Sequence, residues 1–220
     1  MRCNIQLHNM DCMDALREME DNQFDLAIVD PPYGLGDRLA IGGCKKRNRM
    51  QEMYLESKWE DVAPDGEYFE ELRRVSKNQV VWGGNYFTEH LPPSKGWVVW
   101  DKKADIKEHL SMCELAWSSF DRKCNKFEFL WAGFKKAEQV VKIHPTQKPV
   151  ALYKWLLNNY AKEDPIFGRP TILDTHLGSG SIAIACWDLG FDLTGYELDE
   201  DYYKAACKRL EKHKAQGHLF

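Results

Sequence analysis

A strand, a glycine-containing turn and a helix follow one another near the end of this 220-residue sequence. Residues 171–174 form an apolar strand pattern that ends in an aspartate, glycines stand at positions 178 and 180, and residues 181–189 have the composition of a buried helix. A second strand pattern then ends beside Glu197. Because strands joined by crossover helices build parallel sheets, this segment restricts the fold to the α/β class.

Strand and helix patterns also alternate in the rest of the chain. Runs of apolar and β-branched residues predict strands at 4–8, 24–29, 79–82, 97–100, 112–117, 127–131, 171–174 and 192–196. Helical spacing of apolar residues predicts helices at 11–19, 67–75, 149–160, 181–189 and 199–212, the first with Asp11 as its N-cap. Since no repeat or linker divides the chain, we expect a single domain over residues 1–220 with a mainly parallel sheet.

Composition limits the class of protein. The formal net charge is −4, from 30 basic and 34 acidic residues, which by itself gives no case for a nucleic-acid partner. Apolar runs are far shorter than the roughly 18 residues of a membrane span, and the first residues lack the apolar core of a signal peptide. The seven cysteines include no Cys-x-x-Cys pair. We therefore expect a cytoplasmic protein with reduced thiols and no metal site.

The glycine turn has the pattern Gly178-x-Gly180-x-x-Ala183, and Glu197 follows 19 residues after its first glycine. In nucleotide-binding α/β folds such glycines let the backbone approach a ligand, and an acid at this distance binds ribose hydroxyls. The sequence lacks the lysine of a phosphate-binding loop here, which disfavours a nucleoside triphosphate. A packing turn would explain the glycines alone, whereas the paired acid favours a ribose-containing ligand.

A second pattern, Asp30-Pro31-Pro32-Tyr33, directly follows the apolar strand 24–29. A turn that ends a strand has a similar composition, but the residues also suit methylation of an exocyclic amino group. Such a nitrogen is a poor nucleophile because its lone pair is delocalised into the ring. Asp30 and the Pro31 carbonyl can accept its two hydrogens, and Tyr33 can stack on a base taken out of its helix. The Pro-Cys pair common in enzymes that methylate a ring carbon of cytosine is missing from the sequence.

Several motifs occur in a fixed order along the chain. They are Asn9-Met-Asp11-Cys12, Asp30-Pro-Pro-Tyr33, Trp82-Gly-Gly-Asn-Tyr-Phe87, His144-Pro-Thr-Gln-Lys-Pro149, Asp174-x-x-x-Gly-Ser-Gly-Ser181, Gly195-Tyr-Glu197 and Asp201-Tyr-Tyr203. In this combination the sequence resembles, over nearly its whole length, the β-class of amino-group DNA methyltransferases, whose usual members are bacterial and phage adenine methylases. The resemblance implies a Rossmann-like class I methyltransferase fold, with a mostly parallel seven-stranded sheet and helices on both faces. Because the catalytic motif precedes the cofactor motif, the sheet should be circularly permuted.

The resemblance also implies S-adenosylmethionine as the cofactor and gives the motif residues roles. The catalytic loop would consist of Asp30, Pro31, Pro32 and Tyr33. Around the cofactor would lie Asp11 and Cys12 beside the adenine, Glu197 on the ribose, Asp174 near the amino group, His144, Thr146 and Lys148 around the carboxylate, and His176, Gly178, Ser179 and Gly180 along the glycine turn. His176 stands where the family often has phenylalanine, and Ser181 where it often has threonine. We interpret His176 as a satisfied pocket residue rather than a base.

Two segments concentrate positive charge. Residues 38–49 contain no acid and five basic residues, namely Arg38, Lys45, Lys46, Arg47 and Arg49. Residues 122–142 contain six basic residues against two acids, interleaved with Phe127, Phe129, Trp131 and Phe134. Basic side chains bind phosphates and aromatic rings stack on bases, although a core strand is the favoured interpretation of the aromatic residues. We expect 34–58 to be a mobile insertion that faces DNA, and 101–142 to hold target-recognition elements within the domain.

The sequence thus predicts a site-specific enzyme that transfers a methyl group from S-adenosylmethionine to the N6 amine of a flipped-out adenine in DNA, with a restriction partner or as an orphan methylase. Asp30 favours adenine, because serine more often takes this place in cytosine-N4 enzymes. Cytosine-N4 DNA methylation and RNA adenine methylation are alternatives, and a non-catalytic module that binds the cofactor and nucleic acid is a further one. Double-stranded DNA is the expected partner, and dimers are common in the family. We expect the enzyme in the cytoplasm of a bacterium or a phage-infected cell.

Overall fold

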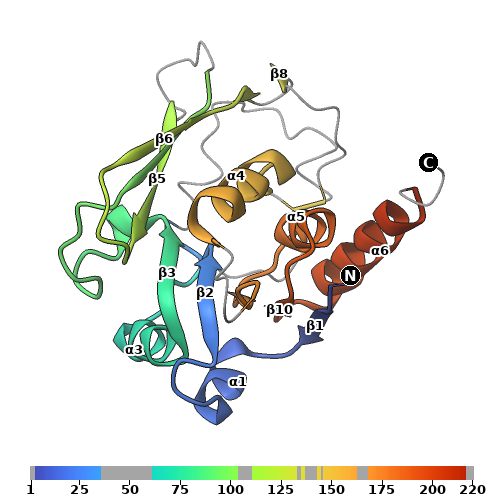
Figure 1. Cartoon of the computed structure of the whole chain (residues 1–220), viewed down its shortest axis with the longest axis horizontal. Helices are drawn as coiled ribbons and strands as arrows, with labels where there is room; N and C mark the ends of the chain where they lie inside the picture. Colours follow the sequence, from blue (N-terminus) through green and yellow to red (C-terminus); the bar gives the residue numbers. More distant parts are fainter. Residues whose placement is uncertain are drawn as a thin grey trace.

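The computed structural model describes residues 3–35, 61–103, 111–132, 135–136, 143–144, 146–162 and 168–216. Within them the chain forms one large sheet with helices packed against it and a separate two-stranded ribbon (Figure 1). The strands are β1 (Ile5–Asn9), β2 (Phe24–Val29), β3 (Ser76–Trp82), β4 (Val98–Asp101), β5 (Cys113–Ser118), β6 (Asn125–Glu128), β7 (Trp131–Ala132), β8 (Lys135–Lys136), β9 (Ile172–Asp174) and β10 (Leu193–Glu197). The helices are α1 (Cys12–Glu18), α3 (Gly66–Val75), α4 (Val150–Tyr160), α5 (Ser181–Leu189), α6 (Glu200–Gln216) and the short 3-10 helix η2 (Gly84–Tyr86).

The large sheet has the strand order β1-β10-β9-β2-β3-β5-β4-β6. The first five strands in this order are parallel, whereas β5 runs antiparallel to both neighbours and β6 runs parallel to β4. The predicted α/β fold with a mostly parallel sheet is confirmed. As the permuted order requires, β2, which precedes the Asp30 motif, lies beside β9, which precedes the glycine turn.

The outer edge of the sheet differs from the prediction. We expected seven strands, and the described residues form eight in the large sheet because β6 pairs with the free edge of β4. The strand predicted at 127–131 is divided, since β6 ends at Glu128 and Trp131 begins the β7-β8 ribbon. An apolar run alone does not reveal where a strand leaves one partner and joins another.

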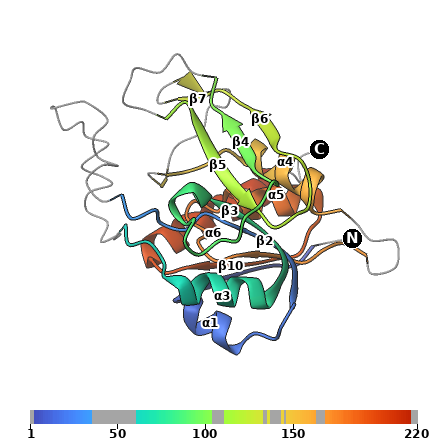
Figure 2. The same cartoon turned by 90° about the vertical axis from the view of Figure 1, so that its left-hand side faces the viewer.

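The central strands are buried on both faces. Along β2, Leu26 and Ile28 join an apolar cluster with residues of α4, α5 and α6, while Ala27 and Val29 join a second cluster with residues of α1 and α3. Successive side chains of a strand point to opposite faces, so a strand covered on both sides needs an almost continuous apolar run. Figure 2 shows α1 and α3 on one side of the sheet and α4 and α5 on the other. The prediction of helices on both faces is confirmed.

Local sequence signals set the helix starts. The Asp11 carboxylate accepts a hydrogen bond of 2.8 Å from the Met13 N–H, as the predicted N-cap should. Helix α4 begins directly after Pro149.

Among the described residues, no helix combines the length and the apolar character that a membrane crossing needs.

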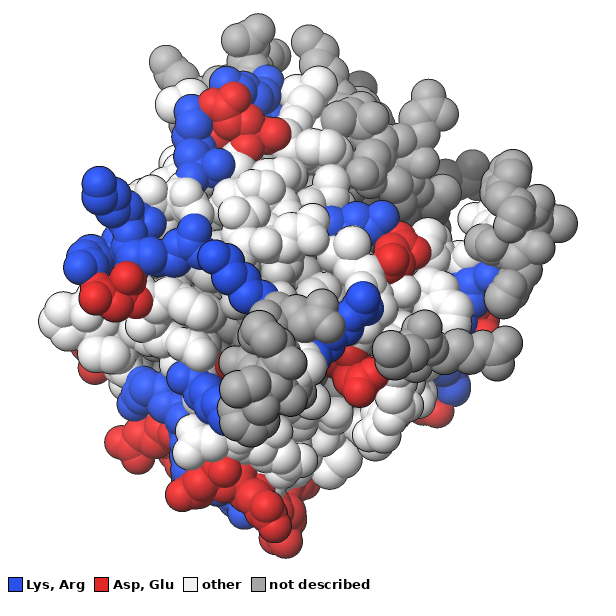
Figure 3. Space-filling model, viewed as in Figure 1, with Lys and Arg blue, Asp and Glu red and all other residues white. Residues whose placement is uncertain are grey.

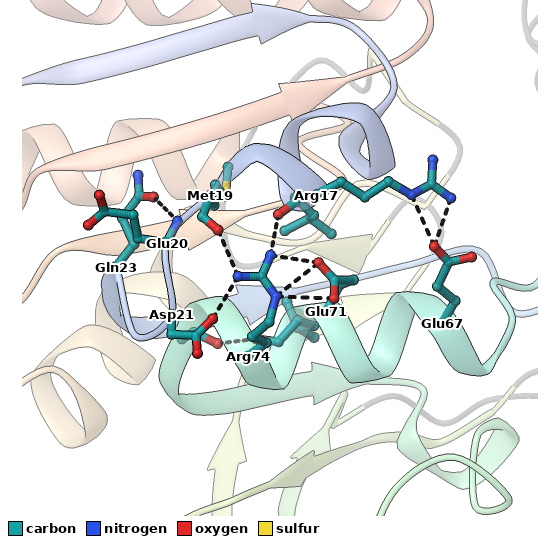
Figure 4. A network of polar contacts seen from close by, with 11 residues as sticks. Arg17, Met19, Glu20, Asp21, Gln23, Glu67, Glu71 and Arg74 are labelled. Carbon is teal, nitrogen blue, oxygen red and sulfur yellow. Dashed lines mark hydrogen bonds and ion pairs between the residues drawn. The ribbon is translucent and has the colours of Figure 1, made fainter.

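A polar network joins the two helices that cover one face of the sheet (Figure 4). The Arg74 guanidinium, near the end of α3, donates hydrogen bonds of 2.8 Å and 2.7 Å to the Leu16 and Met19 carbonyl oxygens at the end of α1. It also pairs with Glu71 and Asp21. A cation at a helix C-terminus satisfies carbonyl groups that have no partner within the helix. Arg74 therefore fixes α1, whose other end begins at Asp11, against α3.

Replacing Arg74 with methionine should lower the melting temperature by a few degrees, because both carbonyl groups lose the Arg74 donor and the Leu16 carbonyl keeps only the Met19 N–H. Thermal unfolding followed by circular dichroism measures the change. Arg17→Met is the matched control, since Arg17 pairs with Glu67 across the same helices but both side chains are about half exposed, and such pairs contribute little. Equal shifts for the two variants would contradict the assignment of Arg74 to the end of α1.

Candidate active site

The site lies where the carboxyl ends of three parallel strands meet. Strands β2 and β9 pair with Leu26 opposite Ile172, and β10 pairs with the other side of β9. The residues at these ends are Asp30 after β2, Asp174 at the end of β9 and Glu197 at the end of β10. Strands β9 and β2 are neighbours in the sheet. The strand that follows β9 in the chain, β10, lies on the far side of β9, and the strand that follows β2, β3, lies on the far side of β2. Open α/β sheets bind ligands at such a switch point.

Two adjoining cavities open at this edge. The larger, of about 440 Å³, is lined by Met10, Asp11, Cys12, Pro32, Val62, Pro64, Thr175, His176, Glu197, Leu198 and Asp199. The smaller, of about 70 Å³, is lined by Asp30, Pro31, Pro32, Tyr33, Asp61, His144, Thr146, Gln147, Lys148, Tyr153, His176, Leu177, Gly178, Ser179 and Glu197. The three shared residues, Pro32, His176 and Glu197, place the two cavities side by side. The structure therefore brings the predicted catalytic loop and most of the predicted cofactor residues to one crevice.

The loop after β2 holds its own aspartate in place. Tyr33 donates a hydrogen bond of 2.7 Å from its hydroxyl to Asp30 Oδ1. The Tyr33 ring stacks on Tyr86 of η2, with ring centroids 5.0 Å apart and planes tilted by 22°, and meets the edge of Phe87. Tyr86 is 47% exposed. The loop thus presents a carboxylate with an aromatic stack beside it.

A chain of alternating charges leads away from Asp30. Lys148 donates from its ammonium group to Asp30 Oδ2 and lies 3.2 Å from Glu114 Oε2. The other oxygen of Glu114 lies 2.6 Å from the Lys102 ammonium. Burial disfavours ionisation of Glu114, but its two lysine partners lower its pKa to about 2. Burial and the nearby Glu114 charge raise the pKa of Asp30, against the opposing effect of Lys148.

Lys148 therefore has partners that its motif alone does not indicate. The resemblance places it near a cofactor carboxylate, whereas in the structure its ammonium group contacts Asp30, Glu114 and the Tyr33 hydroxyl. Its side chain is only 4% exposed. Lys148 lines the smaller cavity and contacts the predicted catalytic loop, so it can affect both.

Glu197 and the glycine turn are bound to each other. The Gly178 N–H donates a 2.7 Å hydrogen bond to Glu197 Oε2, and the Asp199 N–H donates one of 3.0 Å to Oε1. Gly178 and Gly180 have φ angles of +50° and +68°, a region that favours glycine. A carboxylate has about four acceptor positions, so Glu197 retains capacity for hydroxyl groups of a ligand.

Asp174 is buried at the end of β9, whereas His176, two residues later, is partly buried and lines both cavities. Burial raises the pKa of Asp174 to about 8 and lowers that of His176 to about 4. The imidazole is therefore neutral at pH 7. Its Nδ1 lies 2.9 Å from the Thr175 hydroxyl oxygen, and its ring meets the edge of Tyr68. These contacts favour the interpretation of His176 as a pocket residue.

The remaining predicted cofactor residues lie at the two ends of the crevice. Thr146 Oγ1 is 3.0 Å from His144 Nδ1 in the smaller cavity. Asp11 and Cys12 line the larger cavity, and burial raises the pKa of the Cys12 thiol to about 12. Cys12 is therefore an uncharged wall residue at neutral pH.

The predicted DNA-contacting residues cannot be placed in the same way. Arg38, Lys45, Lys46, Arg47 and Arg49 lie outside the described residues, as does most of 34–58. At the described start of this segment, the Gly34 and Leu35 N–H groups donate to the Asp61 carboxylate. Figure 3 shows the face of the molecule that is seen in Figure 1. Basic side chains lie at several places on this face, mostly with an acidic side chain beside them.

Within 101–142, the described aromatic residues belong to the core. The rings of Phe127 and Phe129 stack with their centroids 5.7 Å apart. Both pack against the apolar cluster that contains Leu26 and Ile28, to which the buried Trp131 also belongs. The core interpretation is confirmed for these three residues, and Phe134 lies outside the described residues. On β6, Lys126 forms an ion pair with Glu128.

Sequence reasoning missed Glu114, Lys102 and Arg209. Arg209 of α6 donates hydrogen bonds of 2.9 Å to the Ser179 carbonyl and to Ser181 Oγ, and so holds the glycine turn from a distant helix. No local pattern marks such a residue. Glu114 did carry a signal, because a charged residue inside an apolar strand pattern needs a buried partner.

A family model described as a DNA methylase, N6_N4_Mtase, matches residues 99–208, which is half of the chain. The chain belongs to this family of amino-group DNA methylases. The predicted resemblance to bacterial amino-group DNA methyltransferases is thereby confirmed. S-adenosylmethionine, the predicted cofactor, is the methyl donor of the family.

Relatives cover almost the whole methylase. The type II methyltransferase M2.DpnII of Streptococcus pneumoniae is 24% identical over 94% of this chain and 89% of its own length. The putative methylase YubD of Escherichia coli (strain K12) is 27% identical over 91% and 87%. Among solved structures, an M1.HpyAVI–SAM complex matches with a TM-score of 0.58 at 18% identity, over 94% of this chain and 100% of that one. The cytosine-N4-specific PvuII DNA methyltransferase matches with a TM-score of 0.61 at 12% identity, over 98% and 92%. The structural likenesses establish the methyltransferase fold.

Gly83→Ala should displace Tyr33 of the predicted catalytic loop. Gly83 has a φ of +68°, and a Cβ added there would lie 2.2 Å from Tyr33 Cε1. We expect destabilisation of about 1–3 kcal/mol and a large loss of activity, measured by urea unfolding and methyl transfer. Gly168→Ala is the control, because Gly168 also has a positive φ but its added Cβ would meet nothing within 4 Å. Equal activity losses would contradict a specific effect on Tyr33.

The raised pKa of Asp174 predicts a pH dependence of stability. The folded protein holds this proton up to pH 8 or so, while the unfolded chain releases it near pH 4. Stability should therefore fall as pH rises through this window. His176, with its lowered pKa, has the opposite effect only below about pH 6.5, so the range from pH 6.5 to 8.5 excludes it, and the comparison with Asp174→Asn assigns the change to Asp174. In urea unfolding, the wild type should lose about 1–2 kcal/mol more than Asp174→Asn over this range. Parallel profiles for the two proteins would contradict the assignment.

Proposed function

We propose that the protein transfers a methyl group from S-adenosylmethionine to the N6 amine of adenine in double-stranded DNA. The observation that carries the proposal is the position of Asp30. Its carboxylate lines the smaller cavity beside the glycine turn, and Tyr33 and Lys148 hold it there. A methyl acceptor bonded to Asp30 would lie next to a donor in the crevice.

The crevice has the form and chemistry that the cofactor needs. A volume of about 440 Å³ for the larger cavity is within the range of small-molecule sites. Its walls combine apolar residues, Met10, Val62 and Leu198, with the Glu197 carboxylate, which suits an adenosine group. The smaller cavity would receive the methionine part, with His144 and Thr146 beside its carboxylate. Asp174, which the resemblance places near the amino group, is not among the residues that line this cavity.

Asp30 and Pro31 would act on the target amine. When bound, the cofactor supplies a methyl group on a sulfonium, whose carbon–sulfur bond breaks with its electron pair on sulfur as the nitrogen–carbon bond forms. Asp30 and the Pro31 carbonyl accept the two amine hydrogens, which favours a pyramidal nitrogen with its lone pair free. The methylated nitrogen carries one extra proton, which passes to Asp30 and then to solvent. Positioning supplies the main acceleration.

Asp30 supports adenine as the target, because serine more often takes this place in cytosine-N4 enzymes. The fold is also found in an enzyme that acts on cytosine, since the structurally similar PvuII methyltransferase is cytosine-N4-specific. The Tyr33–Tyr86 stack offers a flipped base an aromatic surface. Residues 34–58 and parts of 101–142 other than β5 and β6 are the proposed DNA-facing elements of a single domain. We place the protein in the cytoplasm of a bacterium or a phage-infected cell, and a homodimer stays a prediction.

Modification-sensitive sequencing of DNA from methylation-deficient bacteria that express the protein tests the proposal, because it reports the base, the atom and the site together. We expect N6-methyladenine at one sequence context, and a loss of at least about 100-fold in Asp30→Asn, which keeps the shape but weakens the acceptor. N4-methylcytosine would support the cytosine alternative. Methylation of RNA alone would redirect the substrate. Full activity of Asp30→Asn, or no methylation of any nucleic acid, would overturn the proposal.

A further inference from the structure

Lys148 shares its ammonium group between two carboxylates. It contacts Asp30 on one side and Glu114 on the other, with a side chain that is 4% exposed. Glu114 stands near the start of β5, outside the motifs of the catalytic loop and the glycine turn. Its second oxygen pairs with Lys102, which follows β4. The four residues form an alternating series of charges, with Asp30 at the end that reaches the active site.

Each oxygen of the Asp30 carboxylate already accepts a hydrogen bond in this arrangement. Tyr33 donates to its Oδ1 and Lys148 donates to its Oδ2. A target amine that bonds to Asp30 competes with these donors, and the Lys148 contact is the more costly to loosen because it joins two opposite charges. A buried ammonium left without a carboxylate is strongly disfavoured. Lys148 therefore needs a second partner when Asp30 turns to the amine.

We propose that Glu114 is a positioning residue for Asp30, which acts by holding the Lys148 ammonium group while Asp30 accepts the target amine. The inference rests on the proposed function. Glu114 is suited to this role because it stays ionised, with a pKa lowered to about 2 by Lys148 and Lys102. Lys102 occupies only one of its oxygens, so the other remains directed at Lys148. The ammonium group needs to move only within its present contacts.

Glu114→Gln keeps the shape of the side chain and removes its charge, and Glu128→Gln is the matched control. Glu128 lies on β6, pairs with Lys126 and Lys103, and is 42% exposed. In single-turnover methyl transfer to unmethylated DNA, we expect Glu114→Gln to be at least about tenfold slower, with cofactor affinity changed by less than about twofold. Glu128→Gln should stay within about twofold of the wild type.

The acid limb of the pH–rate profile distinguishes positioning from mere packing. The titratable groups that face Asp30 come from several elements: Tyr33 on its loop, Tyr68 on α3, Glu114 on β5, Lys148 before α4, Tyr153 on α4 and Asp174 on β9. Removing the Glu114 charge should lower the pKa of Asp30 and move the acid limb to lower pH. Lys102→Gln should move it to higher pH, because it removes a positive charge and leaves Glu114 to compete more strongly for Lys148. A loss of packing predicts no such opposite shifts.

A double-mutant cycle tests whether Glu114 acts through Lys148. In a Lys148→Gln background, Glu114→Gln should cause no further loss of rate. Titration of the Asp30 carboxyl by NMR of ¹³C-aspartate-labelled protein, assigned with Asp30→Asn, measures the coupling without activity. Its midpoint should fall in Glu114→Gln, rise in Lys102→Gln and stay unchanged in Glu128→Gln. If Glu114→Gln does not fold, the Asp30 midpoint in Lys102→Gln tests the coupling.

The outcomes separate the two proposals. A wild-type protein that transfers no methyl group to DNA would remove the proposed function, and the Asp30 titration would then decide the coupling alone. An active wild type with Glu114→Gln equal to Glu128→Gln in rate, acid limb and Asp30 midpoint would overturn the role of Glu114. Additive rate losses in the Lys148→Gln background would do the same.

Discussion

The parallel pairing of β2 with β9 is the contact on which the rest of the structure depends. It joins the first part of the chain to the last, with Leu26 opposite Ile172 and Ala27 opposite Leu173. Both strands are buried on both faces, so a shift of register by one residue would exchange the side chains of the two apolar clusters. The register also fixes which residues follow the strands side by side. Asp30 and the turn after Asp174 lie at one crevice because β2 and β9 pair in this register.

The same burial that fixes the strands determines the chemistry of their ends. A carboxylate at the edge of a dry sheet must find a partner or keep its proton. Glu114 finds two lysines and stays charged, whereas Asp174 has a backbone N–H and a pKa raised to about 8. Asp30 lies between these cases, since it shares Lys148 with Glu114. Carboxylates in one crevice thus differ in charge because their partners differ.

The features predicted correctly from the sequence are those set by neighbours along the chain. The Asp11 cap, the apolar run of β2 and the glycine turn before α5 are local, and each lies where the pattern placed it. The partners of Lys148 and the hold of Arg209 on the glycine turn come from elements far apart in sequence, so they depend on the order of the strands. The edge of the sheet was predicted least well, because a short apolar run can pair with any free edge.

The antiparallel direction of β5 explains why Glu114 was missed when site residues were sought only at the carboxyl ends of strands. In a parallel sheet, only residues that follow the strands reach the binding edge. Strand β5 runs the other way, with Trp82 of β3 opposite Ala116 and the Gly83 N–H donating to the Leu115 carbonyl. Its first residues therefore lie at the edge where the parallel strands end, and Glu114 reaches Lys148 from the start of a strand. For mixed sheets of this kind, charged residues near the start of an antiparallel strand belong in the search for site residues.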